Sequence, residues 1–352
     1  MISAKLKTAI VGATGYSGAE LTRLLLHHSH ADTPVLLRRE SERETSEVGG
    51  TLADEVPAFS GNGGCPLQSL SWPALKKQRV ELIFLATPHE VSRILAPKAL
   101  AEGFRVVDLS GAWRLKQARN RAVYQFEDED SVTAAELTEK AVYGLPEING
   151  DQIADAALVA NPGCYATSVI LALAPLLRAG LVDRGRGMIS DSKSGVSGAG
   201  KAPNSRNHFV SVADNFSAYA VFGHRHLGEI IEQLDLKSNE FTFTPHLLPI
   251  PRGILSTLYV YLDRQMKPGE VESCLRNFYA GKPWVRIFAT PQLPQIQFSS
   301  HTNYCDIGFC LADDGRRLIL VSCLDNLLKG AAGQAVQNMN LMYGWREEEG
   351  LQ

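Results

Sequence analysis

The first half of the chain alternates short apolar runs with amphipathic stretches. Apolar runs at residues 5–11, 34–37, 80–86 and 104–109 predict strands, and the third is continuously apolar, as in a strand buried on both faces of a parallel sheet. Between the last two, residues 91–103 repeat their apolar positions at helical spacing and end in glycine. Because strands and helices alternate, the pattern predicts an α/β fold with a Rossmann-like, doubly wound parallel sheet.

The pattern changes after Asn161-Pro162-Gly163, where a long apolar helix is predicted over residues 164–179. We place a domain boundary here. The elements expected beyond it indicate a second, α+β domain. Strands are expected at residues 188–192, 241–248, 255–262 and 317–322, and helices at 226–234, 268–279 and 326–343.

Composition narrows the function classes without naming one. The 352 residues carry a formal net charge of -3 and are 45% hydrophobic, which is typical of a soluble globular protein and gives no global basic field for nucleic acid. Six cysteines without a CxxC pair are too sparse for a disulfide scaffold and favour a reducing compartment. With no export signal and no apolar run of about 18 residues, we expect a cytoplasmic protein with neither a membrane nor a nucleic-acid partner.

Glycines follow the first predicted strand at Gly12, Gly15 and Gly18 and lead directly into a helical pattern. A dinucleotide-binding turn needs glycine for its tight bend, for close approach of the pyrophosphate and for packing of helix against strand. The spacing is GxxGxxG, so a plain strand-to-helix turn is the alternative. Its position after the first strand favours the nucleotide interpretation.

The second strand ends in Leu37-Arg38-Arg39-Glu40-Ser41. An acidic residue at this point suits the ribose 2'-hydroxyl of NAD, whereas arginines and hydroxyls suit the 2'-phosphate of NADP. The sequence therefore favours NADP, with Arg38, Arg39 and Ser41 as contacts. A solvated charged loop is the alternative for any one of these residues.

Cys164 begins the long apolar helix after a Pro-Gly turn, and the positive end of a helix favours the thiolate form of a cysteine. A second group of functional side chains lies in Gly223-His-Arg-His226-Leu-Gly-Glu229. Because His226 and Glu229 share one helix face, the carboxylate can orient the imidazole for proton transfer. A metal site is the weaker alternative, since no third ligand with suitable spacing is present.

Two further segments suit an anion. Residues 192–201 combine hydroxyls, glycines and two lysines, which fit a phosphate or an acyl phosphate, and a flexible linker is the alternative. Residues 248–253 add an arginine, Arg252, between proline and glycine.

Several motifs in this order resemble those of the N-acetyl-gamma-glutamyl-phosphate reductase family, from Gly12 almost to the C-terminus. Two departures are Trp113, where the family has phenylalanine, and Lys201, where arginine is common. The motifs are Asp108-Leu-Ser-Gly-Ala-Trp-Arg114, Tyr143-Gly-Leu-Pro-Glu147, Asn161-Pro-Gly-Cys164-Tyr-Ala-Thr, Ser194-Gly-Val-Ser-Gly-Ala-Gly-Lys201, Gly223-His-Arg-His226, Pro251-Arg-Gly-Ile-Leu255 and Asp325-Asn-Leu-Leu-Lys-Gly-Ala-Ala-Gly-Gln334.

The resemblance implies an NADP-dependent enzyme of arginine biosynthesis that reduces an acyl phosphate to a semialdehyde. Cys164 would form a thioester, His226 would act as acid and base, and Glu229 would hold its ring. Substrate contacts are implied for His224, Arg114, Arg252, Ser194, Ser197 and Lys201. Cofactor contacts are implied for Gly12, Thr14, Gly15, Tyr16, Ser17, Gly18, Arg38, Arg39, Ser41, Asn326 and Lys329.

The resemblance also implies a domain plan and an assembly. Residues 1–163, completed by a C-terminal helix within 324–352, would bind NADP(H), and residues 164–323 would carry catalysis and the contacts of a homodimer or homotetramer. Two other acyl-phosphate reductases, of the aspartate semialdehyde and acetyl-aminoadipate types, remain alternatives, because they would use the same cysteine and fold. The acetyl-aminoadipate substrate differs by one methylene, which a hydrophobic pocket distinguishes by only about 1–3 kcal/mol. A catalytically silent NADP-binding regulator is a third alternative.

Overall fold

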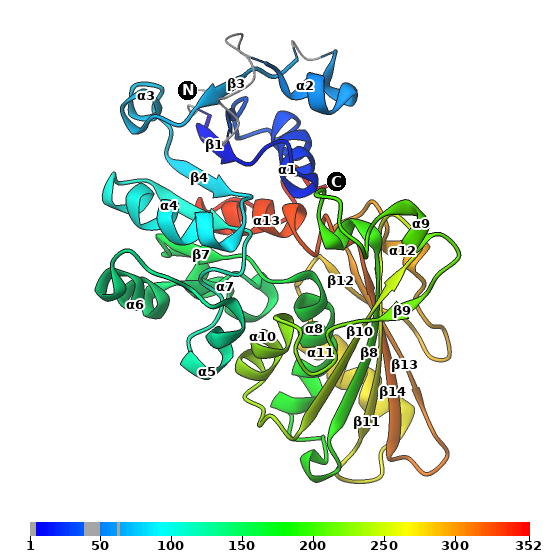
Figure 1. The fold of residues 1–352 in the computed structure, drawn as a ribbon. Helices are drawn as coiled ribbons and strands as arrows, with labels where there is room; N and C mark the ends of the chain where they lie inside the picture. The colour runs from blue at the N-terminus through cyan, green and yellow to red at the C-terminus, as the bar shows by residue number, and fades with distance from the viewer. Residues whose placement is uncertain (1–4, 39–49, 62–63) are drawn as a thin grey trace. The chain divides into compact units, whose positions relative to one another are not determined.

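The computed structural model describes residues 5–38, 50–61 and 64–352. Its contacts divide the chain into two compact units, whose elements are drawn in Figure 1. Unit 1 combines residues 1–116, 124–161 and 331–352, and unit 2 combines residues 117–123 and 162–330. The domain plan expected from the sequence, with junctions after residue 163 and before residue 324, stays a prediction.

Unit 1 contains one seven-stranded sheet in the order β3-β2-β1-β4-β5-β7-β6, and its strand pairs are all parallel. The four central strands β1, β2, β4 and β5 are almost completely buried, because helices cover both faces. The predicted doubly wound sheet is confirmed. Its strands are β1 (Thr8–Val11), β2 (Val35–Arg38), β3 (Leu67–Ser69), β4 (Leu82–Leu85), β5 (Arg105–Asp108), β6 (Val142–Tyr143) and β7 (Leu158–Ala160).

Chain segments from both ends build unit 1. Helix α13 is buried along nearly its whole length and packs against α1 and α7. It begins at Ala332, later than the predicted start at 326, because Asp325 holds the preceding residues in a tight turn by accepting from the N–H groups of Leu327 and Leu328. The helices of unit 1 are α1 (Tyr16–Leu26), α2 (Leu52–Glu55), α3 (Trp72–Lys77), α4 (His89–Ala101), α6 (Ser131–Lys140), α7 (Pro146–Ala154) and α13 (Ala332–Met342).

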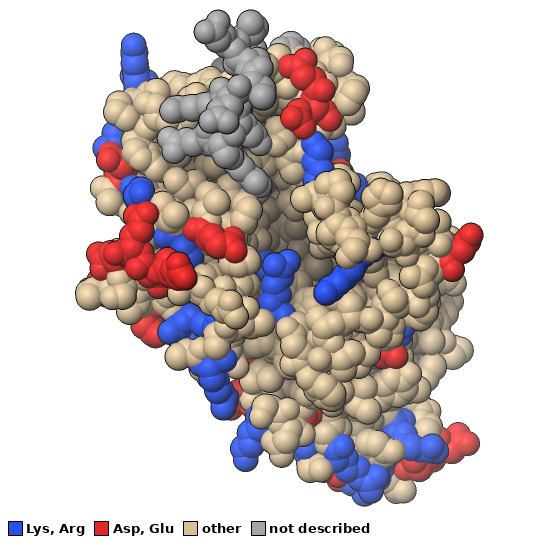
Figure 2. All heavy atoms as spheres, viewed as in Figure 1, with Lys and Arg blue, Asp and Glu red and all other residues tan. Residues whose placement is uncertain are grey.

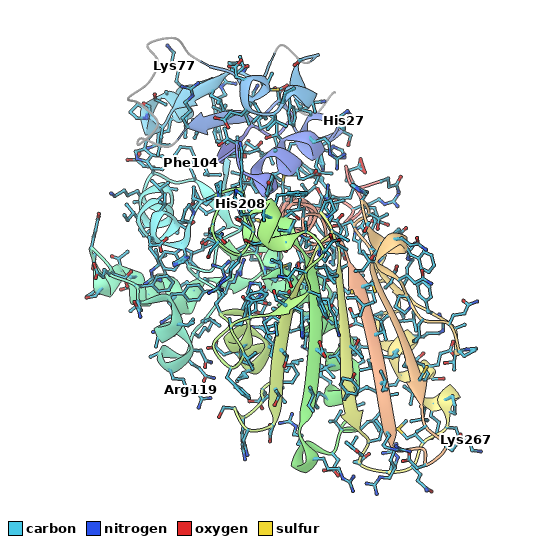
Figure 3. The ribbon with its side chains drawn as sticks, turned by 45° about the vertical axis from the view of Figure 1, so that its right-hand side comes forward. His27, Lys77, Phe104, Arg119, His208 and Lys267 are labelled. Carbon is cyan, nitrogen blue, oxygen red and sulfur yellow. The ribbon has the colours of Figure 1, made fainter. Side chains whose placement is uncertain are left out.

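Unit 2 contains a mixed seven-stranded sheet in the order β12-β13-β14-β11-β8-β10-β9. Helix α8 packs on one face of this sheet and α11 packs on α8. In Figure 3 the strands lie in front of α11, which is drawn in yellow. The strands are β8 (Met188–Gly195), β9 (Ser217–Ala218), β10 (Phe241–Leu248), β11 (Ile254–Tyr261), β12 (Val285–Ile287), β13 (Cys305–Leu311) and β14 (Arg317–Leu324), and the helices are α5 (Ala118–Arg121), α8 (Cys164–Arg178), α9 (Phe209–Val212), α10 (His226–Gln233), α11 (Pro268–Phe278) and α12 (Ile296–Ser299).

The opposite face of this sheet carries an apolar row that no helix of unit 2 covers. Ile189, Tyr259 and Ile319 lie side by side on neighbouring strands and are 47%, 43% and 38% exposed. Successive residues of a strand point to opposite faces, so Ser190, Leu258 and Leu320 face α8 and are completely buried. The sheet therefore has one closed face and one open face.

In unit 1, His28 ties the chain after α1 to helix α13. Its Nδ1 accepts from the N–H groups of His30 and Ala31 at 3.2 and 3.1 Å, so the ring proton lies on Nε2 and is donated to the side-chain oxygen of Asn340 at 2.9 Å. Burial lowers the pKa of His28, and only the neutral ring can accept at Nδ1.

We expect acid to weaken this connection. His28 takes up a proton more readily in the unfolded chain, so its contribution to stability is complete above about pH 6.5 and is lost progressively as the pH falls toward the lowered folded-state pKa. Replacing His28 by glutamine should lower the melting temperature by roughly 2–4 °C at pH 7.5, and the difference from wild type should shrink by pH 5. Thermal scans of both proteins across this range check it, and a constant difference would contradict it.

Candidate active site

Cys164 is the first residue of α8 and is partly exposed. Gly163 precedes the helix in an extended conformation, and no side chain caps this helix end. The backbone N–H groups of the first turn have no acceptor within the helix, and their positive partial charge favours an anion there. Gly330 also borders this residue, because a Cβ on Gly330 would lie 2.7 Å from the Cβ of Cys164.

Buried hydroxyls fix α8 on the sheet below it. Ser168, one helical turn after Cys164, has its Oγ 2.9 Å from Oγ of Ser256 and 3.0 Å from Oγ of Ser322. These three side chains are completely buried, so the hydrogen bonds satisfy groups that would otherwise destabilise the fold. The helix start that carries Cys164 is thereby held in position relative to β11 and β14.

His226 and Glu229 reach the same helix start from α10. Glu229 is completely buried, and its Oε2 accepts from the N–H of Gly163 at 2.9 Å. Its Oε1 lies 4.0 Å from Nε2 of His226. The imidazole lies directly against Gly163, where a Cβ would collide with the ring. The structure thus brings Cys164, His226 and Glu229 together within unit 2.

His224 is held as a neutral acceptor beside His226. Its Nδ1 accepts from the backbone N–H of His226 at 3.1 Å, and the two ring centroids are 4.6 Å apart. Burial, assisted by the charge of Arg225, lowers the pKa of His224 to about 3. The two histidines therefore differ in environment, although they are only two residues apart.

Two tyrosines border this group and were missed by sequence reasoning. Tyr165 follows Cys164, stacks edge to face on His224 with centroids 5.5 Å apart, and donates its hydroxyl to the carbonyl of His246 at 2.7 Å. The hydroxyl of Tyr219 lies 3.5 Å from both the Tyr165 hydroxyl and Nε2 of His224. Burial raises the pKa of both phenols. Their only sequence signal is proximity to Cys164 and to the histidine segment.

The predicted anion segment lies at the end of β8. Ser194 is buried and donates to the carbonyl of Gly195 at 3.0 Å, and it also hydrogen-bonds Tyr165. Ser197 lies in the following turn and accepts from the side chain of Asn326 at 2.9 Å. Lys201 is exposed beyond that turn. The two serines are therefore joined to the Cys164 region, whereas Lys201 lies at the surface.

A buried carboxylate organises the segment before Gly330. Asp325 accepts from the backbone N–H of His301 at 2.7 Å and pairs with the Arg252 guanidinium at 3.1 Å. Next to it, Asn326 accepts from the N–H of Gly253 at 2.7 Å. Lys329 is completely buried in the same segment. Four residues predicted for substrate or cofactor, namely Ser197, Arg252, Asn326 and Lys329, thus belong to one connected wall of unit 2.

The glycine turn lies in unit 1, between β1 and α1. Gly12 has a φ of +86°, and a Cβ there would collide with the carbonyl oxygen of Ala86. A Cβ on Gly18 would likewise collide with the backbone of Gly12. At Gly15 the nearest atom would be 3.5 Å away, so the protein's own packing does not require glycine at this position. A glycine that packing does not require, at a helix N-terminus, suits close approach of a phosphate. Thr14, Tyr16 and Ser17 flank the turn, and Tyr16 is exposed.

Two predicted arginines of unit 1 are described. Arg38 is the last residue of β2 and is half-buried. It lies at the strand end whose sequence predicts a preference for the 2'-phosphate of NADP. Arg114 is buried, and its guanidinium donates to the carbonyls of Asn161 and Leu109, both at 2.7 Å. Arg39 and Ser41 lie outside the described residues.

The described residues show neither a metal site nor a membrane-spanning helix. No cluster of three or more histidine, cysteine, aspartate or glutamate side chains could hold a metal ion there. Within the same residues, no helix is both long and apolar enough to cross a membrane. On the face drawn in Figure 2, acidic and basic side chains are interspersed rather than gathered in one basic stripe.

Comparison with known proteins decides the family. Residues 7–156 match the semialdehyde dehydrogenase NAD-binding domain, and residues 164–326 match the semialdehyde dehydrogenase dimerisation domain. N-acetyl-gamma-glutamyl-phosphate reductase of Desulfotalea psychrophila is 43% identical over 99% of this chain and 98% of its own. The proteins of that name from Geobacter metallireducens and Geobacillus kaustophilus are 43% and 41% identical, each over 99% of this chain and 98% of their own. The chain belongs to the N-acetyl-gamma-glutamyl-phosphate reductase family.

Members of this reductase family are oxidoreductases, so the chain is an enzyme of that class, and the resemblance drawn from its motifs is confirmed. Solved structures show that its fold is that of semialdehyde dehydrogenases. Aspartate semialdehyde dehydrogenase II of Vibrio cholerae superposes with a TM-score of 0.71 at 18% identity, over 97% of this chain and 99% of that one. The Candida albicans enzyme superposes with a TM-score of 0.70 at 15% identity, over 97% and 99%.

Proposed function

We propose that the chain reduces N-acetyl-gamma-glutamyl phosphate with NADPH to N-acetyl-L-glutamate 5-semialdehyde and phosphate, a step of arginine biosynthesis. The observation that carries the proposal is the group formed by Cys164, His226 and Glu229 at one helix start, in a chain whose relatives bear the name of this reductase. This group combines a nucleophile, a proton carrier and a carboxylate that fixes both.

Cys164 is the nucleophile in this proposal. Its sulfur attacks the acyl carbon, the bond from that carbon to the phosphate oxygen breaks, and inorganic phosphate leaves with a thioester on the enzyme. The chemistry that NADPH supplies when bound is a hydride for the acyl carbon. Backbone N–H groups at the α8 start stabilise negative charge on the acyl oxygen as it develops. The cycle ends when the carbon–sulfur bond breaks and Cys164 leaves as a thiolate.

His226 is the acid and base, and Glu229 is its positioning residue. His226 gives a proton to the acyl oxygen after hydride addition and removes it as the aldehyde departs. Glu229 is hydrogen-bonded to Gly163 and lies 4.0 Å from the ring, so it fixes the imidazole next to the nucleophile. His224, with its pKa lowered to about 3, is neutral at working pH and suits a role in binding substrate.

We assign the anionic groups of the substrate to the arginines and to the segment after β8. Ser194 and Ser197 receive the phosphate, with Lys201 at its outer end, because hydroxyls and glycine amides of this segment can donate to oxyanions. Arg252 and Arg114 bind the α-carboxylate or the phosphate. Asp325 keeps the Arg252 guanidinium in a fixed orientation, which lowers the entropic cost of binding an anion.

Unit 1 holds the phosphate groups of the cofactor in this proposal. Gly15 is assigned to the pyrophosphate, since the packing of unit 1 does not itself explain a glycine at this helix N-terminus. Thr14, Tyr16 and Ser17 complete the turn, and Arg38 with Arg39 and Ser41 selects the 2'-phosphate. Asn326 and Lys329, which belong to unit 2, are the residues assigned to the nicotinamide.

Replacing Arg38 by aspartate tests the 2'-phosphate contact. Its loss, together with repulsion between two negative groups, should weaken NADPH binding at least about tenfold and leave NADH binding within about twofold. Fluorescence titration with both nucleotides measures the two effects. Replacing Arg23, which is exposed on α1 and pairs with Glu20, gives a matched control for the lost charge. Equal weakening of NADPH and NADH would exclude the contact.

A homo-oligomer, either a dimer or a tetramer, is part of the proposal. Unit 2 matches a dimerisation domain over residues 164–326. Its open sheet face carries Ile189, Tyr259 and Ile319 in one apolar row, which a second copy can bury.

The reaction is best tested in reverse, because the acyl phosphate is unstable. N-acetyl-L-glutamate 5-semialdehyde, phosphate and NADP+ should give NADPH absorbance that requires phosphate. Aspartate semialdehyde and acetyl-aminoadipate semialdehyde are the competing substrates. Preference for either would retain the mechanism and overturn the substrate, and no turnover with any of the three would favour a silent NADP-binding regulator.

A further inference from the structure

The segment of residues 205–223, which we call the arm, exposes more apolar surface than a stable protomer usually leaves uncovered. It connects the anion segment to His224 and contains the short elements α9 and β9. Figure 3 labels His208 at the start of α9, and Figure 2 shows the surface around α9 and β9 mostly in tan. Its exposed apolar side chains are Phe209 (80%), Val210 (78%), Phe222 (72%), Phe216 (54%) and Val221 (45%).

The backbone of the arm is held in conformations that non-glycine residues rarely adopt. Asp214, Ala220 and Phe222 have positive φ angles of 56°, 45° and 59°. Such residues persist where surrounding contacts fix them, and they concentrate at functional segments. Phe222 combines such a φ with a side chain that is 72% exposed, so its own protomer buries little of it.

The arm ends on the groups around Cys164. Tyr219 lies 3.5 Å from the Tyr165 hydroxyl and from Nε2 of His224, which is the outer limit of a hydrogen bond. Beyond it, His224 accepts from the N–H of His226. The backbone N–H of Tyr219 donates to the carbonyl of Pro245 at 3.0 Å, so the position of Tyr219 and His224 follows the path of the arm along β10.

The arm is also continuous with the open face of the unit 2 sheet. Strand β9 pairs with β10 at the sheet edge, through Ala218 and His246. Phe216 stacks on the His246 ring with centroids 4.9 Å apart. His246 is in register with Lys193, which lies two residues from Asp191 and four from Ile189 on the same strand face. The arm thus lies at the edge of the open sheet face, and the charged pair of Lys193 and Asp191 lies between it and the apolar row.

We propose that the arm packs on a second copy of this chain and that this contact fixes Tyr219 and His224 in their catalytic positions. The second copy is the occupant because the arm lies inside the region matched by a dimerisation domain and adjoins the open sheet face. It is largely apolar, as the buried centre of a homodimer interface is. The proposed link to activity rests on the proposed function, whereas the contact itself does not. Tyr219 and His224 act here as positioning or substrate-binding groups, with the arm as their support.

The test uses the full-length protein with Phe209 and Phe222 both replaced by glutamate. Val132→Glu is the matched control, because Val132 is 68% exposed in unit 1 and lies outside the arm. Sedimentation velocity over a range of protein concentrations should show at least a tenfold weaker self-association for the double variant and no change for the control. Circular dichroism checks that both variants are folded.

Activity and cysteine reactivity then test the link to the site. The specific activity of the double variant should be proportional to the fraction of protein that is assembled, and it should rise with protein concentration. A local folding defect would give a low activity that does not depend on protein concentration. The alkylation rate of Cys164 with iodoacetamide, read by peptide mass spectrometry, should show the same concentration dependence even if no substrate is turned over. Unchanged self-association would overturn the proposal. A raised KM with unchanged self-association would also overturn it and would indicate that the arm covers substrate within its own protomer.

Discussion

The Cys164→Ser variant is expected to lose at least about 10³-fold in kcat while binding NADPH as tightly as wild type. A serine hydroxyl at the α8 start cannot supply the thiolate that forms the thioester, and its alkoxide is a poor leaving group when the aldehyde is released. Binding should survive because Cys164 belongs to unit 2 and the glycine turn belongs to unit 1. Steady-state rates at the NADPH absorbance and a fluorescence titration with NADPH measure the two quantities.

Cys310→Ser provides the matched control. Cys310 is exposed on β13 of the same unit, so its replacement should leave both rate and binding within about twofold. Residual activity above about a tenth in Cys164→Ser would exclude a covalent thioester on this residue. Loss of NADPH binding in that variant would instead show that the two units do not divide the work as proposed.

The second large effect is expected for His226→Asn, which should lower kcat by about 10²–10⁴. The His226 ring is only 6% exposed, lies against Gly163 and has its Nε2 4.0 Å from Oε1 of Glu229, so its replacement removes the proton carrier beside the nucleophile. Removal of the proton carrier should also remove the limb of the kcat/KM profile that titrates with a histidine. Rates between pH 5.5 and 9 measure both effects.

His224→Asn distinguishes the two histidines. Because burial lowers the pKa of His224 to about 3, this ring does not change charge in the assay range. Its replacement should raise KM for the semialdehyde more than it lowers kcat and should leave the shape of the pH profile intact. Loss of the histidine limb in His224→Asn, with the limb retained in His226→Asn, would reverse the assignment.

Strands with continuous apolar runs and helices with clear apolar periodicity were predicted well. The expected helix at 164–179 matches α8, and the expected strand at 241–248 matches β10. Strand β13 was missed because its second residue, Asp306, is a buried carboxylate that breaks the apolar pattern. The Arg286 guanidinium binds that carboxylate at 2.6 and 2.8 Å, and this partner is 20 residues away in sequence. The local sequence pattern does not show that an arginine 20 residues away neutralises the buried carboxylate of Asp306.

The candidate site was predictable only where its residues are close in sequence. His226 and Glu229 share a helix face, so their association could be expected from spacing. Glu229 also contacts the backbone of Gly163, which the sequence does not show. Tyr219 was missed because its position depends on the path of the arm, which has no regular periodicity. The tight turn held by Asp325 was missed for a similar reason, since its small residues read as helix.

The participation of both chain ends in unit 1 has a consequence for biosynthesis. Nearly all residues of helix α13 are buried in unit 1. One of them, Asn338, donates to the carbonyl of Gly144 and to the side-chain oxygen of Asn161. On the ribosome, the parallel sheet therefore emerges early but lacks helix α13 until residues 332–342 have been translated. Unit 2 has all of its residues once position 330 has been translated. A chain that terminates there would contain all of unit 2 and an incomplete unit 1. The apolar strands of unit 1 would then be exposed to chaperones and proteases.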